Sequence, residues 1–129
     1  MNGKRLTKIT SALEDAVQND CKAGVTISFS GGIDSTLVAF LAKKYTSIEL
    51  IAVGVKGSHD VEAAKSAAKL IDLELTVTEV TDSEFLSEAL ILQRKLNLTQ
   101  FEVGFMLPFW IAAKNAKNQI LMCGQGADE

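Results

Sequence analysis

The stretch TISFSGGIDSTLVAF, residues 26–40, places a polar loop with two glycines between two apolar runs. β-Branched residues before the loop favour a strand, and the run after it is apolar on most sides, as in a packed helix. Gly31 and Gly32 allow the backbone to approach an anion, and the start of the following helix adds partial positive charge. The stretch therefore predicts either an ordinary turn or a strand–loop–helix unit that holds phosphate.

The rest of the chain alternates between helical and strand patterns, which predicts an α/β fold with a three-layer open parallel sheet and helices on both faces. If the crossovers are right-handed, the strand order is 3-2-1-4. Residues 97–107 are predicted to be irregular or mixed, and Pro108 fits the first turn of the last helix. The predicted helices are 5–19, 35–45, 60–71, 81–96 and 108–117, and the predicted strands are 24–29, 48–55, 73–80 and 119–123.

The composition is that of an ordinary globular protein, and 129 residues suit a single domain over residues 1–129. No apolar run reaches the roughly 18 residues that span a bilayer, and residues 1–10 lack the apolar stretch of a signal peptide. The net charge of −3 gives no reason to expect nucleic-acid binding. We therefore expect a cytoplasmic domain with no membrane and no nucleic-acid partner. Cys21 and Cys123 have no metal-ligand spacing and are expected to be free thiols rather than a disulfide.

Three polar, glycine-containing loops follow predicted strands: SGGIDST at 30–36, GVKGSHD at 54–60 and GQGADE at 124–129. In open α/β sheets, ligands bind outside the carboxyl ends of the strands, where the strand order reverses. That reversal lies between the first and fourth strands of the predicted order. The first and last of these loops are therefore expected to face each other across one cleft.

The side chains of the first loop suit a phosphate site that contains a metal ion. Ser30, Ser35 and Thr36 can donate hydroxyl hydrogen bonds, whereas Asp34 would repel phosphate unless a cation such as Mg²⁺ lies between them. Alternatively, Asp34 only caps the helix. Asp128, together with the adjoining terminal glutamate, offers carboxylates from the opposite loop, or is simply part of an exposed acidic end.

SGGIDST matches the S-G-G-x-D-S loop of the N-type ATP pyrophosphatases, the PP-loop superfamily, at every defining position. Within that superfamily the chain most resembles the synthetase domain of asparagine synthetase. VGVKGSHD at 53–60 and GQGADE at 124–129 are similar to the two further motifs of that domain. The resemblance covers roughly residues 20–129 and implies an adenine nucleotide alpha hydrolase-like fold.

The resemblance also implies a reaction in which ATP is cleaved between its α- and β-phosphates. A carboxylate acceptor, aspartate in the family, becomes an acyl-adenylate, and ammonia then displaces AMP. The family pattern places Asp34 and Asp128 on Mg²⁺, and Val53 and Gly124 beside the adenosine. The residues implied to hold ATP through its pyrophosphate are Ser30, Gly31, Gly32, Asp34, Ser35 and Thr36.

Gln125 departs from the family pattern, because asparagine synthetases carry at this position a glutamate thought to assist ammonia attack as a base. Glutamine can form hydrogen bonds but cannot accept that proton. The alternatives are therefore an amide ligase, another PP-loop ligase such as an NAD or GMP synthetase relative, or a MgATP-binding module or non-catalytic subunit. Gln125 favours the last of the three, whereas the intact SGGIDST loop and Asp128 favour the first.

The family's glutaminase domain and the later part of its synthetase domain, with a lysine that contacts ATP phosphates, have no counterpart in these 129 residues. We therefore expect a minimal homologue or a fragment, with nitrogen coming from free ammonia or a complementary subunit. Phe101, Phe105, Phe109 and Trp110 recur near helical spacing and are expected in the core or at an interface, including that of a possible homodimer. The single histidine, His59, is expected to face solvent.

Overall fold

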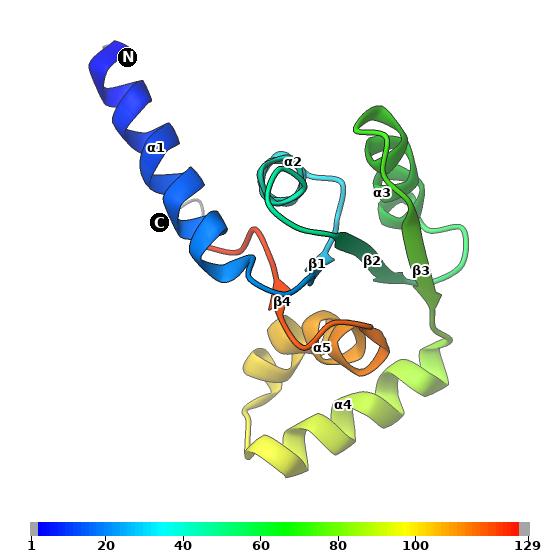
Figure 1. The fold of residues 1–129 in the computed structure, drawn as a ribbon. Helices are drawn as coiled ribbons and strands as arrows, with labels where there is room; N and C mark the ends of the chain where they lie inside the picture. Colours follow the sequence, from blue (N-terminus) through cyan, green and yellow to red (C-terminus); the bar gives the residue numbers. More distant parts are fainter. Residues whose placement is uncertain (1–2, 127–129) are drawn as a thin grey trace.

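The computed structural model describes residues 3–126 and contains a four-stranded parallel sheet with the order β3-β2-β1-β4 (Figure 1). The predicted α/β class and strand order are confirmed. The strands are β1 (Val25–Ser28), β2 (Ile48–Gly54), β3 (Leu75–Glu79) and β4 (Leu121–Met122), and the helices are α1 (Gly3–Asp20), α2 (Ile33–Ala42), α3 (His59–Leu70), α4 (Asp82–Leu96) and α5 (Gln100–Asn115).

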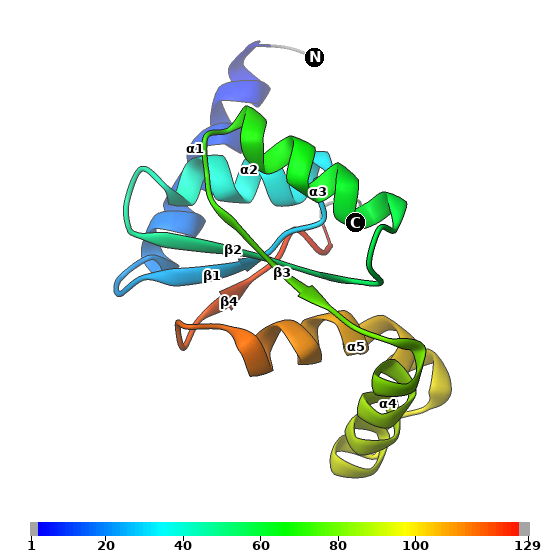
Figure 2. The ribbon, with the colours of Figure 1, turned by 90° about the vertical axis from the view of Figure 1, so that its right-hand side faces the viewer.

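Helices lie on both faces of the sheet. Helices α2 and α3 cover one face, with α1 beside α2, while α5 covers the other face and α4 packs on α5 away from the sheet (Figure 2). Because both faces are covered, the central strands carry nearly continuous apolar side chains, and Val25, Ile27 and Leu50 are fully buried. None of the helices within residues 3–126 has the length and apolar character needed to cross a membrane.

A partly buried polar network ties the segment before β4 to the amino-terminal ends of β1 and β2. Thr26 Oγ1 donates to Glu49 Oε2 at 2.7 Å, and the Lys117 backbone N–H donates to the same oxygen at 2.9 Å. Asn118 Nδ2 donates to Thr26 Oγ1 at 3.2 Å. These bonds add to the two residue pairs that join β4 to β1, and so help to hold a short edge strand in register.

The start of α5 corrects the prediction that residues 97–107 are irregular. Thr99 caps the helix by accepting a bond from the Glu102 backbone N–H, and the Glu102 carboxylate accepts one from the Thr99 backbone N–H at 2.8 Å. This capping box starts α5 eight residues before Pro108, which therefore lies inside the helix and not in its first turn. Proline leaves the Gly104 carbonyl without its usual donor, and Gly104 is exposed, so water can bind that carbonyl.

Glu88 joins α4 to α5 by accepting hydrogen bonds from Lys114 Nζ and from Trp110 Nε1. The bond from Lys114, followed by that from Trp110, lowers the pKa of Glu88. Because the Glu88 carboxyl has a lower pKa in the folded state, its ionised form stabilises the fold at pH values above the unfolded-state pKa of glutamate. This contribution is lost as the pH falls through the folded-state pKa of Glu88.

We expect Lys114→Met to raise the pKa of Glu88 toward its ordinary value, because the largest cause of the lowering is removed. Titration of the Glu88 carboxyl carbon by NMR measures this shift. Lys65→Met, which breaks the exposed Lys65–Glu62 pair on α3, is the matched control and should leave Glu88 unchanged. An unchanged Glu88 pKa in Lys114→Met would contradict the assignment of the shift to Lys114.

Candidate functional site

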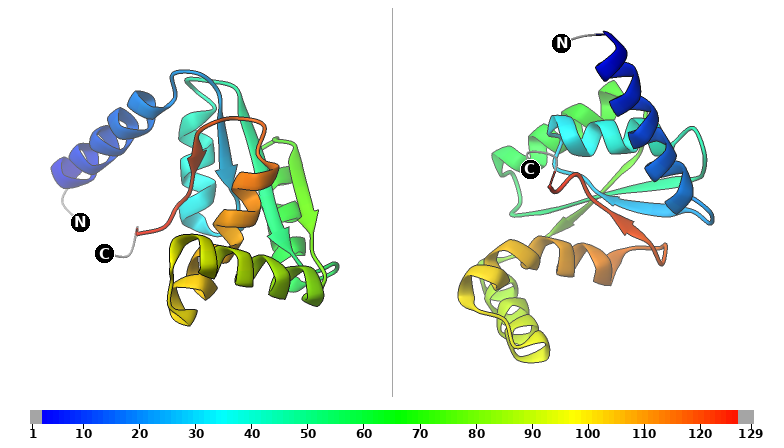
Figure 3. Two further views of the ribbon diagram at one scale, coloured as in Figure 1. Left: turned by 90° about the horizontal axis from the view of Figure 1, so that it is seen from below. Right: turned by 90° about the vertical axis from the view of Figure 1, so that its left-hand side faces the viewer.

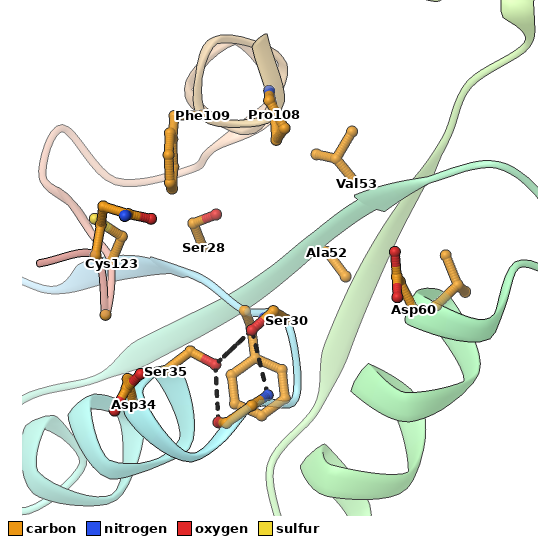
Figure 4. A pocket seen from close by; sticks show the side chains of 15 residues that line it. Ser28, Ser30, Asp34, Ser35, Ala52, Val53, Asp60, Pro108, Phe109 and Cys123 are labelled. Atoms are coloured by element: carbon orange, nitrogen blue, oxygen red, sulfur yellow. Dashed lines mark hydrogen bonds between the residues drawn. The ribbon is translucent and has the colours of Figure 1, made fainter. Parts of the chain in front are cut away.

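A cavity of 370 Å³ lies at the carboxyl edge of the sheet, where the sequence predicted a cleft (Figure 4). Its walls come from the loop after β1, the end of β2, the start of α3, the middle of α5 and the segment after β4. It is lined by Ser28, Phe29, Ser30, Gly32, Asp34, Ser35, Ala52, Val53, Asp60, Val61, Pro108, Phe109, Cys123, Gly124 and Gln125.

Most of the residues singled out from the sequence meet in this cavity. Gly31 and Thr36 do not line it, because both lie at a separate apolar groove between α2 and α3. Asp128 falls outside the described residues. The sequence-predicted residues that line the cavity are Ser30, Gly32, Asp34, Ser35, Val53, Gly124 and Gln125.

The loop after β1 is held in shape by its own hydroxyl groups. The Ser35 side chain is buried, accepts from the Ser30 backbone N–H at 3.3 Å and donates to the Gly32 carbonyl at 3.2 Å. The Gly32 backbone N–H in turn donates to Ser30 Oγ at 3.2 Å, as Figure 4 shows. Ser35 therefore positions the loop, whereas the exposed Ser30 is the hydroxyl that remains accessible from the cavity.

The amino-terminal end of α2 is open to an anion. Gly32 is the N-cap residue and has no side chain, and among residues 3–126 no side chain caps the first turn of α2. Free N–H groups at a helix start, together with the helix dipole, form a site that favours phosphate. This geometry fits the pyrophosphate part of a nucleotide.

Two glycines allow backbone segments to approach each other closely around this loop. Gly31 has a φ of +78°, and a Cβ there would lie 2.7 Å from the Ala63 carbonyl oxygen of α3. A Cβ on Gly124 would lie 2.7 Å from the Ser35 backbone nitrogen and 2.8 Å from Asp34 Cβ. The segment after β4 therefore lies directly against the start of α2, as expected for loops that face each other across one cleft.

Two carboxylates line the cavity, Asp34 from the first turn of α2 and Asp60 from α3, and both residues are exposed. Within residues 3–126 no group of three or more His, Cys, Asp or Glu residues could hold a metal ion by itself. Mg²⁺ is commonly bound by one or two carboxylates together with substrate phosphates and water. The residues present therefore fit Mg²⁺ that arrives with a nucleotide.

Asp60, Pro108 and Phe109 are among the lining residues that the sequence did not assign to the site. Asp60 belongs to the VGVKGSHD motif, so the sequence contained a signal that was not assigned a role. Phe109 and Pro108 reach the cavity because α5 passes over the end of β2, which the sequence pattern alone did not indicate. Both cysteines are free as predicted: Cys21 is buried, and Cys123 is exposed at the cavity wall.

The structure has a parallel sheet of order 3-2-1-4, an SGGIDST loop at the carboxyl edge of that sheet and an uncapped helix start behind the loop. These features place the chain in the PP-loop ATP pyrophosphatase superfamily. Residues 8–129 match the protein family described as asparagine synthase. The chain belongs to the asparagine synthase family.

Known proteins similar to this chain support the same placement. Over 109 residues it is 31% identical to a protein of Methanocaldococcus jannaschii described as a putative glutamine-hydrolyzing asparagine synthetase 1, covering 81% of this chain and 20% of that protein. The solved NH3-dependent NAD synthetase of Campylobacter jejuni aligns with a TM-score of 0.58 and 25% identity, over 89% of this chain and 54% of that one.

A solved predicted subunit of tRNA methyltransferase from Methanocaldococcus jannaschii also has a TM-score of 0.58, at 23% identity, over 83% of this chain and 55% of that chain. At this identity the likeness concerns the fold alone. The chain thus spans about a fifth of the curated relative and just over half of each solved structure.

Proposed function

We propose that this chain is an ATP-dependent amide-forming ligase domain of the asparagine synthetase kind, which releases AMP and pyrophosphate. The observation that carries the proposal is that one cavity gathers Ser30, Gly32, Asp34 and Ser35 of the loop after β1 with Val53, Gly124 and Gln125. We also propose that residues 1–129 form one domain, which corresponds to the first part of a synthetase domain.

In this proposal, Ser30, Gly32 and the free N–H groups at the start of α2 bind the pyrophosphate part of ATP. Val53 and Gly124 lie beside the adenosine, on the other walls of the cavity. Asp34 holds Mg²⁺, with Asp128 proposed as a second ligand. When bound, Mg²⁺ neutralises charge on the leaving pyrophosphate, which is the main requirement in this type of phosphate chemistry.

The proposed reaction has two steps. An oxygen of the substrate carboxylate, proposed to be that of aspartate, forms a bond to the α-phosphorus of ATP, and the bond to pyrophosphate breaks. The nitrogen lone pair of ammonia then attacks the activated carbonyl carbon, the bond to the AMP oxygen breaks, and a proton leaves the nitrogen. A base near the carbonyl accelerates the second step by accepting this proton.

Gln125 supports an alternative function, a MgATP-binding module that lacks amide synthesis. Gln125 is exposed and lines the cavity, but its neutral amide cannot act as a base. In this alternative, the chain retains either the formation of the acyl-adenylate or only the binding of MgATP. A third candidate, another PP-loop ligase, is supported by the likeness to the NH3-dependent NAD synthetase.

The two steps can be measured separately, and we expect them to respond differently to Gln125→Glu. Exchange of labelled pyrophosphate into ATP, dependent on aspartate, reports the first step, and formation of asparagine from ammonium reports the second. We expect Gln125→Glu to increase asparagine formation by at least about 100-fold, within the range of general-base catalysis, and to leave the exchange rate nearly unchanged.

Gln119→Glu is the matched control, because Gln119 is exposed and does not line the cavity. Tight MgATP binding without exchange for any carboxylate would contradict the ligase proposal and support the binding module. Exchange that depends on a carboxylate other than aspartate would support the third candidate. No gain in Gln125→Glu, with exchange intact, would show that position 125 does not limit the second step.

A further inference from the structure

Helix α4 has apolar side chains on the side that faces α5 and also elsewhere, where Leu86, Leu90 and Ile91 are exposed. Phe85, Ala89 and Leu92 pack against α5 in a buried cluster. Leu86 and Leu90 project elsewhere and are 64% and 45% exposed. A surface helix normally has one apolar stripe, with polar residues opposite it, so the face of α4 with Leu86 and Leu90 has no partner in the described part of the chain. Figure 3 shows α4 at the outside of the molecule, separated from the sheet by α5.

The exposed leucines belong to a row of four residues that begins with an acid and ends with a base: Asp82, Leu86, Leu90 and Arg94. Residues four apart form one ridge along a helix. None of the ion pairs found within residues 3–126 includes Asp82 or Arg94. We refer to these four residues as the α4 ridge.

The α4 ridge is complementary to itself. Two copies of α4 can be related by a two-fold axis that passes midway between Leu86 and Leu90. In this arrangement Leu86 of one copy faces Leu90 of the other, and Asp82 of one copy faces Arg94 of the other. Such an axis generates an interface that uses the same patch on both subunits. A partner with a different sequence would need a base, two apolar groups and an acid at the same spacing, which a second copy supplies without further assumption.

We propose that the α4 ridge binds a second copy of this chain, with the two α4 helices antiparallel. In this pair, Leu86 packs on Leu90 of the partner subunit, and Asp82 lies opposite Arg94 of the partner subunit. The patch is small, so the dimer belongs to the weak class of interfaces that bury less than about 1,200 Å². Exposed ion pairs are screened by salt, so the dimer weakens as ionic strength rises.

Sedimentation velocity of the full chain across micromolar to millimolar concentrations tests this pairing. We expect a concentration-dependent dimer that weakens at about 1 M salt, where charges interact only over about 3 Å. Asp82→Arg alone, or Arg94→Asp alone, places like charges opposite each other twice per dimer and should weaken association by about tenfold. Leu86→Glu should abolish association.

The double variant Asp82→Arg with Arg94→Asp is the decisive arm, because it restores opposite charges across the axis. It retains the unfavourable arginine at the start of α4, so recovery of the dimer cannot be attributed to repair of the helix. Circular dichroism checks that each variant is folded. The proposal would be overturned if the chain is a monomer at every concentration or if neither single variant weakens the dimer. It would also be overturned if the double variant does not restore the dimer. Each of these results would leave this face to a different partner. None of these measurements depends on the proposed function.

Discussion

Replacing Gly31 with alanine is expected to reduce the free energy of unfolding by about 3 kcal/mol. Alanine at a φ of +78° is strained, and its Cβ would lie 2.7 Å from the Ala63 carbonyl oxygen and 2.9 Å from Ala64 Cα. These are backbone atoms of α3, so relief requires the loop or the helix to move. Urea denaturation followed by circular dichroism measures the loss.

Gly32→Ala is the matched control, one residue along in the same loop. Gly32 has a φ of −71°, and among the described residues a Cβ there would contact only Ser30 Oγ, at 3.3 Å. The expected loss is below about 1 kcal/mol, because alanine adopts this backbone conformation without strain. Equal losses in the two variants would mean that the contact between the loop and α3 is not what makes glycine necessary at position 31.

Asp34→Asn is expected to change ATP binding in opposite directions with and without Mg²⁺. With Mg²⁺ present, the affinity should fall by about tenfold or more, equivalent to about 1.4 kcal/mol, because a ligand of the metal is lost. With EDTA present, the variant should bind ATP at least as tightly as the original chain, since a carboxylate that repels phosphate has been removed. Isothermal titration calorimetry under both conditions measures the effect.

Asp15→Asn on α1 makes the same change in net charge outside the cavity and controls for long-range electrostatics. The other cavity carboxylate, Asp60, can be changed to asparagine in the same way to ask whether it shares the metal. If Asp34→Asn loses the same affinity with and without Mg²⁺, then Asp34 contributes to the shape of the loop and not to a metal site.

The sheet could be predicted because its determinants are local. Short β-branched runs mark the strands, and the handedness of the crossovers then leaves one natural order for the four predicted strands. The polar loops at 30–36 and 124–129 follow strands that are neighbours in that order, so part of the cavity followed directly. The structure adds that the close packing of Gly124 against α2 brings these loops together.

Features that depend on packing between distant segments could not be predicted in the same way. A Cβ on Gly31 would point toward α3, and Gly31 and Thr36 line the groove between α2 and α3 rather than the cavity. Phe109 reaches the cavity only because α5 crosses the sheet there. The early start of α5 is different, because Thr99 and Glu102 have the sequence spacing of a capping box, a local signal that the prediction did not use.

The two walls of the cavity are anchored unequally, and this bears on how quickly a bound nucleotide could leave. The wall that begins at Ser30 follows β1, which has strands on both sides, whereas Gly124 follows β4, which lies at the edge of the sheet within residues 3–126 and has two paired residues. Local opening of an edge segment requires less free energy than opening of the centre of a sheet. In the proposed MgATP site, the wall at Gly124 is therefore the one that opens more easily, and the Thr26–Glu49 network at the opposite end of the sheet acts on that wall, without touching the ligand, by holding β4 in place.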